Sequence, residues 1–119
     1  MSNNTFALNI PKLKENLYND QDIFVEIAKA MCDDIVQRGA RLNRAVQSRD
    51  ASVARQEAHA FRGGLGSVTA TTAAGLAAEL EHMAIASEWG GFDTKLALFN
   101  TELKRVSKEF EDELVKLAL

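Results

Sequence analysis

Residues 20–47, DQDIFVEIAKAMCDDIVQRGARLNRAVQ, carry apolar side chains at steps of three and four residues. An α-helix has 3.6 residues per turn, so this spacing places the apolar side chains on one face of a long helix. Asp20 precedes the pattern and can cap the helix by accepting a free backbone N–H group. This face must be buried against other helices. It comprises Phe24, Ile27, Met31, Ile35, Leu42 and Val46, widened by Val25, Cys32 and Val36.

The rest of the chain has the same periodicity. Pro11 suits the first turn of a short helix that ends near Tyr18, because its ring fixes φ and it has no N–H group to satisfy. A third helix follows the loop 48–50, a fourth follows the threonines of 69–72 and ends at Gly90–Gly91, and a fifth runs to the end of the chain. The expected caps are Asn9 or Asn4, Asp50, the hydroxyls of Thr69–Thr72, and Asp93. The expected core positions are Ala54, Ala58, Phe61, Leu65 and Val68, then Leu76, Leu80, Met83 and Ala84, and finally Leu96, Phe99, Leu103, Val106, Phe110, Leu114 and Leu117.

Four long helices joined by short loops predict an all-α protein, an antiparallel four-helix bundle with a short additional N-terminal helix. The chain has 119 residues, 46% hydrophobic and 26% charged, which fits one domain over residues 1–119. Cys32 is the only cysteine, so an internal disulfide is excluded. It lies on the apolar face without a histidine at helical spacing, and we expect a small hydrophobic residue there rather than a nucleophile.

Charge and hydropathy exclude two classes of partner. The net charge is −3, so the chain lacks the basic balance typical of nucleic-acid binding. No apolar run approaches the roughly 20 residues that span a bilayer, and the start of the chain lacks the features of a signal peptide. We therefore expect a cytoplasmic protein, monomeric and without a membrane partner.

His59 lies on the third predicted helix, away from its apolar face. At about 100° per residue, the apolar face centres near Ala58 and Leu65, and His59 falls about 140° from that centre. We therefore expect His59 to face solvent. Gln56 lies about one turn before it and Gly63 one turn after it on the same exposed face.

Three glycines follow this histidine, at Gly63, Gly64 and Gly66. Glycine in an exposed helix interior costs about 1 kcal/mol relative to alanine, so their presence needs a reason. One reason is the close approach of another surface to His59. Two simpler interpretations stay open: Gly63–Gly64 can end the helix as a C-cap, and a single exposed histidine can be an ordinary solvated side chain. The apolar spacing continues in phase to Val68, which favours a helix that runs past the glycines.

Residues 59–68, HAFRGGLGSV, are followed by Leu76 and by Glu79–Leu80–Glu81 on the next predicted helix. This pattern resembles the signature of histidine-containing phosphotransfer (HPt) domains, His-x-(hydrophobic)-Lys-Gly-x-x-(small)-x-(hydrophobic), then Leu and Leu-Glu. The motif covers about a quarter of the chain, and the expected order of helices extends the resemblance to nearly all of it. The departures from the pattern are Arg62 for the usual Lys, Thr69 where Gly is common, and Ala73 where Leu is common.

The resemblance implies a phosphocarrier that takes a phosphoryl group from an aspartate of a receiver domain, in a hybrid sensor kinase or response regulator, and passes it to another receiver. It implies that His59 is the phosphoacceptor and that Arg62 stands near the phosphoryl oxygens in place of the lysine. Glu81 falls where the family has a polar side chain near the histidine and could orient its ring. Gly63 would let the partner close over the ring. The residues expected to dock the partner are Arg55, Gln56, Gly63, Gly66 and Ser67.

The chemistry of an exposed imidazole agrees with this role, because such a ring is largely neutral near neutral pH and can act as a nucleophile. Phosphoryl transfer depends mainly on positioning and charge neutralisation. We therefore expect no cofactor on this chain and Mg²⁺ from the partner receiver domain. No glycine-rich nucleotide loop follows a strand, so we expect a carrier rather than a kinase that uses ATP.

Two other functions are compatible with a helical bundle. One is a non-catalytic adaptor that binds receiver domains or other helices, and the other is the phosphoacceptor domain of a chemotaxis-type kinase separated from its catalytic part. The intact His59 favours the carrier over the adaptor. Met1 and a helix end at Leu119 favour a complete protein over a fragment.

Charged side chains elsewhere give weaker signals. Six of the seven arginines lie between Arg38 and Arg62, opposed there only by Asp50 and Glu57, and could steer an acidic rim of the partner toward His59. An ordinary solvated helix surface remains the alternative. His82 has no cysteine or second histidine at ligand spacing, so we expect a surface residue and no metal site. We expect solvated carboxylates at Asp33, Asp34, Glu109, Glu111, Asp112 and Glu113.

Overall fold

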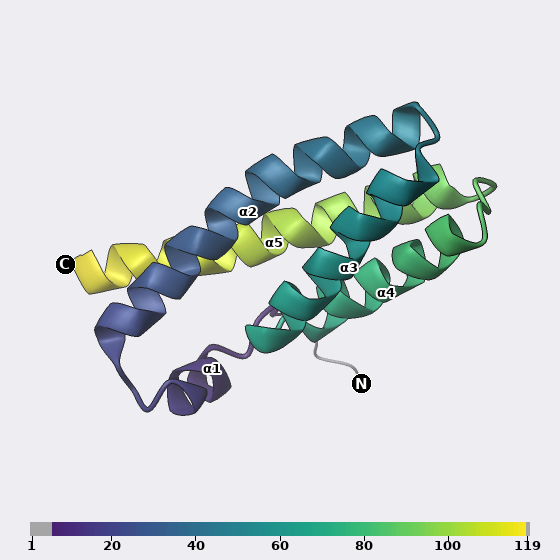
Figure 1. Ribbon diagram of the computed structural model, residues 1–119. Helices are drawn as coiled ribbons and strands as arrows, with labels where there is room; N and C mark the ends of the chain where they lie inside the picture. The colour runs from purple at the N-terminus through teal and green to yellow at the C-terminus, as the bar shows by residue number, and fades with distance from the viewer. Residues whose placement is uncertain (1–5, 119) are drawn as a thin grey trace.

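The computed structural model describes residues 6–118, and within this range it contains helices and no strand. Figure 1 shows four long helices packed side by side and a short helix, α1, at one end of the bundle. Contacts between successive helices and between α2 and α5 close the bundle, so α3 and α5 lie diagonally opposite. The expected fold class is therefore confirmed. The helices are α1 (Ile10–Asn16), α2 (Gln21–Gln47), α3 (Ala51–Ser67), α4 (Thr71–Ile85) and α5 (Phe92–Ala118).

Three of the expected helix caps are confirmed. The side chains of Asn9, Asp20 and Asp50 each accept a hydrogen bond from the backbone N–H three residues later, at 3.1 Å. Such a bond satisfies one of the four N–H groups that a helix start leaves unpaired. The alternative cap Asn4 lies outside the described residues. Each long turn of the bundle thus begins where a short polar side chain precedes an apolar repeat.

The expected caps of α4 and α5 are wrong. Ala70 occupies the N-cap position of α4 without a side-chain hydrogen bond. Thr69 instead adopts a φ of 67°, and its hydroxyl accepts from the Asn9 N–H at 2.9 Å. α5 begins at Phe92, so Asp93 lies inside its first turn, where its carboxylate is 3.5 Å from the Arg49 guanidinium.

The fourth helix also ends earlier than its glycines predict. α4 stops at Ile85, and residues 86–91 form the connection to α5. Only Gly91 of the glycine pair has a positive φ, of 79°. Trp89, in the same connection, lies under the Arg49 guanidinium, 5.2 Å from its ring centroid. This contact joins the α4–α5 connection to the α2–α3 turn at one end of the bundle.

Phenylalanine side chains fill the centre of the bundle. Phe61 on α3 meets Phe99 on α5 edge to face at 5.1 Å, and Phe24 on α2 lies 6.1 Å from Phe110 on α5. The expected apolar stripes are buried or half-buried, with one exception. Val36 is 71% exposed, because it lies at the outer edge of the α2 stripe, one turn beyond the half-buried Cys32.

The short helix α1 and the segment before it are attached to the bundle by acidic side chains. The Glu109 carboxylate accepts from the backbone N–H groups of Ala7 and Leu8 at 2.6 and 2.8 Å. Glu113 accepts from Lys14 at 3.0 Å. The expectation that Glu109 and Glu113 are merely solvated is therefore wrong, because each carboxylate meets N–H donors of the N-terminal segment.

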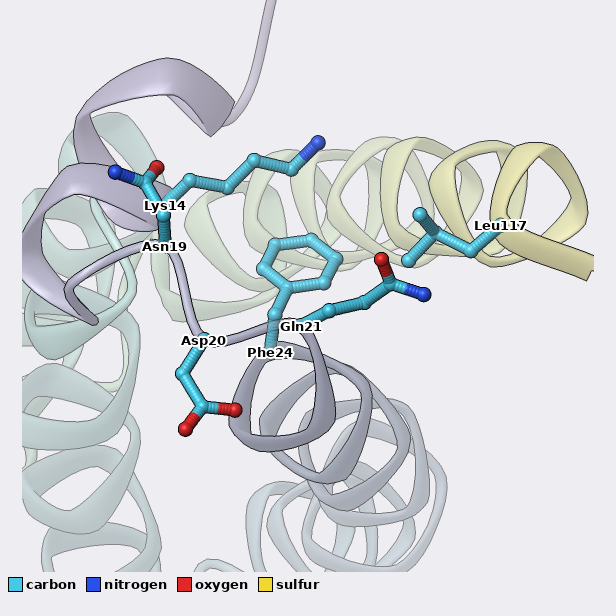
Figure 2. A pocket seen from close by; sticks show the side chains of 6 residues that line it. All are labelled: Lys14, Asn19, Asp20, Gln21, Phe24 and Leu117. Carbon is cyan, nitrogen blue, oxygen red and sulfur yellow. The ribbon is translucent and has the colours of Figure 1, made fainter.

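Figure 2 shows the small cavity that forms where α1, the start of α2 and the end of α5 meet. The Phe24 ring lies between Lys14 and Leu117, and the Lys14 ammonium is 5.4 Å from its centroid. The cavity volume is about 100 Å³. No helix within residues 6–118 combines the length and the apolar composition needed to cross a bilayer.

Candidate functional site

The structure places His59 in the middle of α3 with its side chain 57% exposed. α3 continues past Gly63 and Gly64 to Ser67. The two glycines therefore do not end the helix, and the C-cap interpretation is excluded. The helical periodicity alone predicted the orientation of His59 correctly.

A buried carboxylate on the neighbouring helix holds the histidine ring. Glu81 on α4 has a side chain only 11% exposed, and its Oε2 lies 2.7 Å from the Nδ1 atom of His59. Its Oε1 lies 3.3 Å from the Nε atom of Arg62. Arg62 Nη2 is in turn 3.3 Å from His59 Nδ1. His59, Arg62 and Glu81, which the sequence placed on two helices, thus form one connected cluster.

The contacts of Nδ1 indicate which ring nitrogen is reactive. A carboxylate accepts hydrogen bonds and does not donate them, so the 2.7 Å contact with Glu81 requires a proton on Nδ1. The longer approach of Arg62 cannot then be a hydrogen bond to this nitrogen, because both groups would be donors. In the neutral ring the lone pair is therefore on Nε2. Glu81 fixes both the orientation and the tautomer of His59.

The surface beyond His59 is smooth. Gly63 is exposed, and a Cβ added to it would meet no other atom within 4 Å. Internal packing therefore gives no reason for glycine at this position. Gly64 differs, because its added Cβ would lie 3.5 Å from the Met31 side chain, and Gly66 faces Ala74 at 4.0 Å. Gly63 is the position whose missing side chain serves an external surface.

The five residues expected to dock a partner all have exposed side chains or an exposed backbone. Ser67 ends α3 and donates from its hydroxyl to the Gly64 carbonyl at 2.7 Å. The others share the outer surface of the same helix with His59. They are Arg55, Gln56, Gly63 and Gly66.

Glu57 is a buried charged residue that sequence reasoning missed. Its carboxylate accepts from Arg38 Nη1 at 2.9 Å and from Arg41 Nε at 3.2 Å, joining α2 to α3 two residues before His59. Its position beside the apolar stripe of α3, opposite arginines spaced one turn apart on α2, was the available signal. Hydropathy alone assigns such a carboxylate to solvent.

The remaining candidates have no neighbours that would make a site. His82 is exposed on α4. Burial and the nearby Glu111 and Asp33 carboxylates raise the pKa of the Cys32 thiol, so this cysteine stays protonated and unreactive. Within residues 6–118 no group of histidine, cysteine and acidic side chains is arranged to hold a metal ion.

Comparisons with known proteins agree with this geometry. Curated protein sequences give no significant match. Among solved structures, histidine-containing phosphotransfer protein B (HptB) from Pseudomonas aeruginosa PAO1 is similar, with a TM-score of 0.83 and 26% sequence identity. The match covers 90% of this chain and 93% of that chain. The family model for the Hpt domain matches residues 26–115. This chain therefore belongs to the Hpt domain family.

Proposed function

We propose that this chain is a histidine phosphotransfer protein of a two-component phosphorelay, with His59 as the residue that carries the phosphoryl group. The single observation that carries the proposal is the exposed imidazole whose Nδ1 is held by the buried Glu81 carboxylate. This contact leaves Nε2 unpaired by any described residue and directed away from Glu81. Membership of the Hpt family supports the same role.

In the proposed reaction, the Nε2 lone pair of His59 attacks the phosphorus of an aspartyl phosphate on a receiver domain. The N–P bond forms as the bond from phosphorus to the aspartate oxygen breaks, and the aspartate leaves as a carboxylate. The ring becomes cationic while Nδ1 keeps its proton, and the Glu81 carboxylate stabilises that charge. Transfer to a second receiver reverses these steps.

Arg62 would serve the phosphoryl group. Its Nε is engaged with Glu81, and its side chain is 49% exposed beside the ring. The outer N–H groups of the guanidinium can donate to phosphoryl oxygens while Nε keeps its contact with the carboxylate. We propose that the receiver supplies the Mg²⁺ that neutralises the transferring group, and that the carrier acts as a cytoplasmic monomer.

A non-catalytic adaptor explains the same structure less well. An adaptor needs a surface but no oriented nucleophile, whereas here a buried carboxylate is committed to the ring of an exposed histidine. Burying a carboxylate is costly unless it is paired, so this arrangement needs a return. Orientation of a nucleophile is such a return.

The test is labelling by a small phosphoramidate donor. Wild-type chain should gain one acid-labile phosphoryl group of about 80 Da, and His59→Gln should gain none. His82→Gln is the matched control, because His82 is also exposed on the bundle surface and should leave labelling unchanged. Equal labelling of wild type and His59→Gln would exclude His59 as the acceptor.

A further inference from the structure

The arginines between Arg38 and Arg62 differ in what they contact. Arg38 and Arg41 share Glu57, and Arg38 also lies 3.9 Å from Asp34. The others with a partner are Arg49, paired with Asp93, and Arg62, paired with Glu81. Four of the six arginines are therefore offset by carboxylates and contribute little net charge to the surface.

Arg44 and Arg55 carry the surplus. Both side chains are exposed, and neither has an ion-pair partner among the residues that the structure describes. Exposed arginines that no neighbouring carboxylate offsets are available to an external one. The positive charge of the α2–α3 surface thus comes from two side chains rather than from the whole basic segment.

The pairing of α2 with α3 places these two arginines at one end of the His59 surface. The helices run antiparallel, with Arg41 beside Glu57 and Met31 beside Gly64. Arg44 and Arg55 therefore both lie between His59 and the α2–α3 turn, and Arg55 is one helical turn from His59. Figure 1 shows this turn at the end of the bundle opposite α1.

The surface on the other side of His59 is uncharged. Gly63, Gly66 and Ser67 follow it along α3, and no ionisable side chain lies on this stretch of the helix. The exposed surface around His59 thus has a basic end toward the α2–α3 turn and a neutral, small-residue end toward Ser67. A partner that covers His59 meets two different chemistries on its two sides.

We propose that Arg44 and Arg55 set the orientation in which a receiver domain docks, by attracting carboxylates on the side of the receiver that lies toward the α2–α3 turn. This inference rests on the proposed function. Both arginines lie within about one or two Debye lengths of His59 at physiological salt, so they act during the approach as well as in the complex. Uncharged receiver surface then covers Gly63 and Ser67.

The experiment measures the second-order rate of phosphoryl transfer from a receiver to this chain at low and high salt. The probe is the receiver domain, from a panel loaded with acetyl phosphate, that labels the wild-type chain fastest. Each rate is divided by the rate of labelling by phosphoramidate, which requires no docking. The variants are Arg44→Glu, Arg55→Glu and their combination. Lys104→Glu is the matched control, since Lys104 is exposed on α5, diagonal to α3.

The double variant should lower the receiver rate by about tenfold or more at low salt, with a smaller loss at high salt, as expected for electrostatic steering. Lys104→Glu should stay within about twofold of wild type. A loss that is equal for Lys104→Glu, or that does not depend on salt, would overturn the assignment.

A relocated charge separates position from net charge. Arg55→Gln/Ser67→Arg keeps the net charge and moves one arginine to the neutral end, and it should remain as slow as Arg55→Gln. Recovery of the wild-type rate would overturn the proposed orientation. Absence of label on wild type from every donor would instead overturn the proposed function itself.

Discussion

His59 Nδ1 lies 2.7 Å from Glu81 Oε2, so a buried carboxylate on α4 holds the ring of an exposed histidine on α3. Removing it should leave the ring free to rotate and to exchange tautomers. Glu81→Ala is expected to slow phosphoryl transfer by about 10-fold to 100-fold, the cost of a misplaced nucleophile. Glu81→Gln should lose less, because its amide oxygen still accepts from Nδ1. Single-turnover labelling measures the rate.

A tautomer measurement distinguishes this positioning role from loss of stability. In wild type, the ¹⁵N chemical shifts of His59 should report a proton on Nδ1, and Glu81→Ala should shift the ring toward the tautomer with the proton on Nε2. Glu79→Gln is the control, since Glu79 is exposed on the same helix and pairs with Lys95. An unchanged tautomer in Glu81→Ala would contradict the role assigned to Glu81.

Gly63→Leu tests whether the missing side chain at this position serves the partner. The added side chain projects into open space, so the fold should persist, with a gain in helix stability of up to about 1 kcal/mol. Transfer from a receiver should fall sharply because the bulk holds the partner away from His59. Gly75→Leu is the matched control, an exposed helical glycine on α4 that also has free space. Transfer at the wild-type rate by Gly63→Leu would refute close docking.

The Phe61–Phe99 contact predicts where the bundle is most sensitive. Phe99 is fully buried and packs edge to face on Phe61 at 5.1 Å, so Phe99→Ala should destabilise the protein by about 3–5 kcal/mol. The neighbouring Leu98 is 54% exposed, and Leu98→Ala should change stability by no more than about 0.5 kcal/mol. Urea denaturation followed by circular dichroism compares the two. Equal losses would contradict the packing described for α5.

The attachment of α1 should weaken in acid. Burial by itself would raise the pKa of Glu113, but hydrogen bonds from Lys14 and Lys116 outweigh it and hold the pKa below its ordinary value. A carboxyl whose pKa is lower in the folded state stabilises the fold at neutral pH. That contribution is lost as the pH falls from the unfolded value, about 4.3, through the lower folded value.

The measurement is the difference in unfolding free energy between wild type and Glu113→Gln. It should be about 1 kcal/mol at neutral pH and should shrink as the pH is lowered below about 5. Glu111→Gln, at an exposed position of the same helix, should show little such dependence. A difference that stays constant from neutral pH to about pH 3 would show that the Glu113 charge does not stabilise the fold.

Local signals in the sequence were sufficient for most of the fold. Asp20 and Asp50 cap helices through bonds that span three residues, so a short window contains the whole interaction. Thr69 failed as a cap because its hydroxyl bonds Asn9, 60 residues away, and its backbone takes a positive φ. A window of one helix contains no trace of that contact.

The site was predictable where it follows helical geometry and was missed where charges are buried. The exposure of His59 and the continuation of α3 past Gly63 follow from periodicity. Glu57 is buried because arginines from α2 reach it, which requires knowing how the two helices pack. Glu81 was placed near His59 by the family resemblance, and only the structure shows that the same carboxylate also holds Arg62.

The most direct test of the carrier role is a round trip between two receiver domains. A purified receiver labelled on its aspartate is mixed with the chain, the labelled chain is isolated, and a second, unlabelled receiver is added. We predict that the label moves to His59, is acid-labile there, and then appears on the aspartate of the second receiver. His59→Gln should take none. Label that never leaves the first receiver, while the wild-type chain is folded, would contradict the central claim.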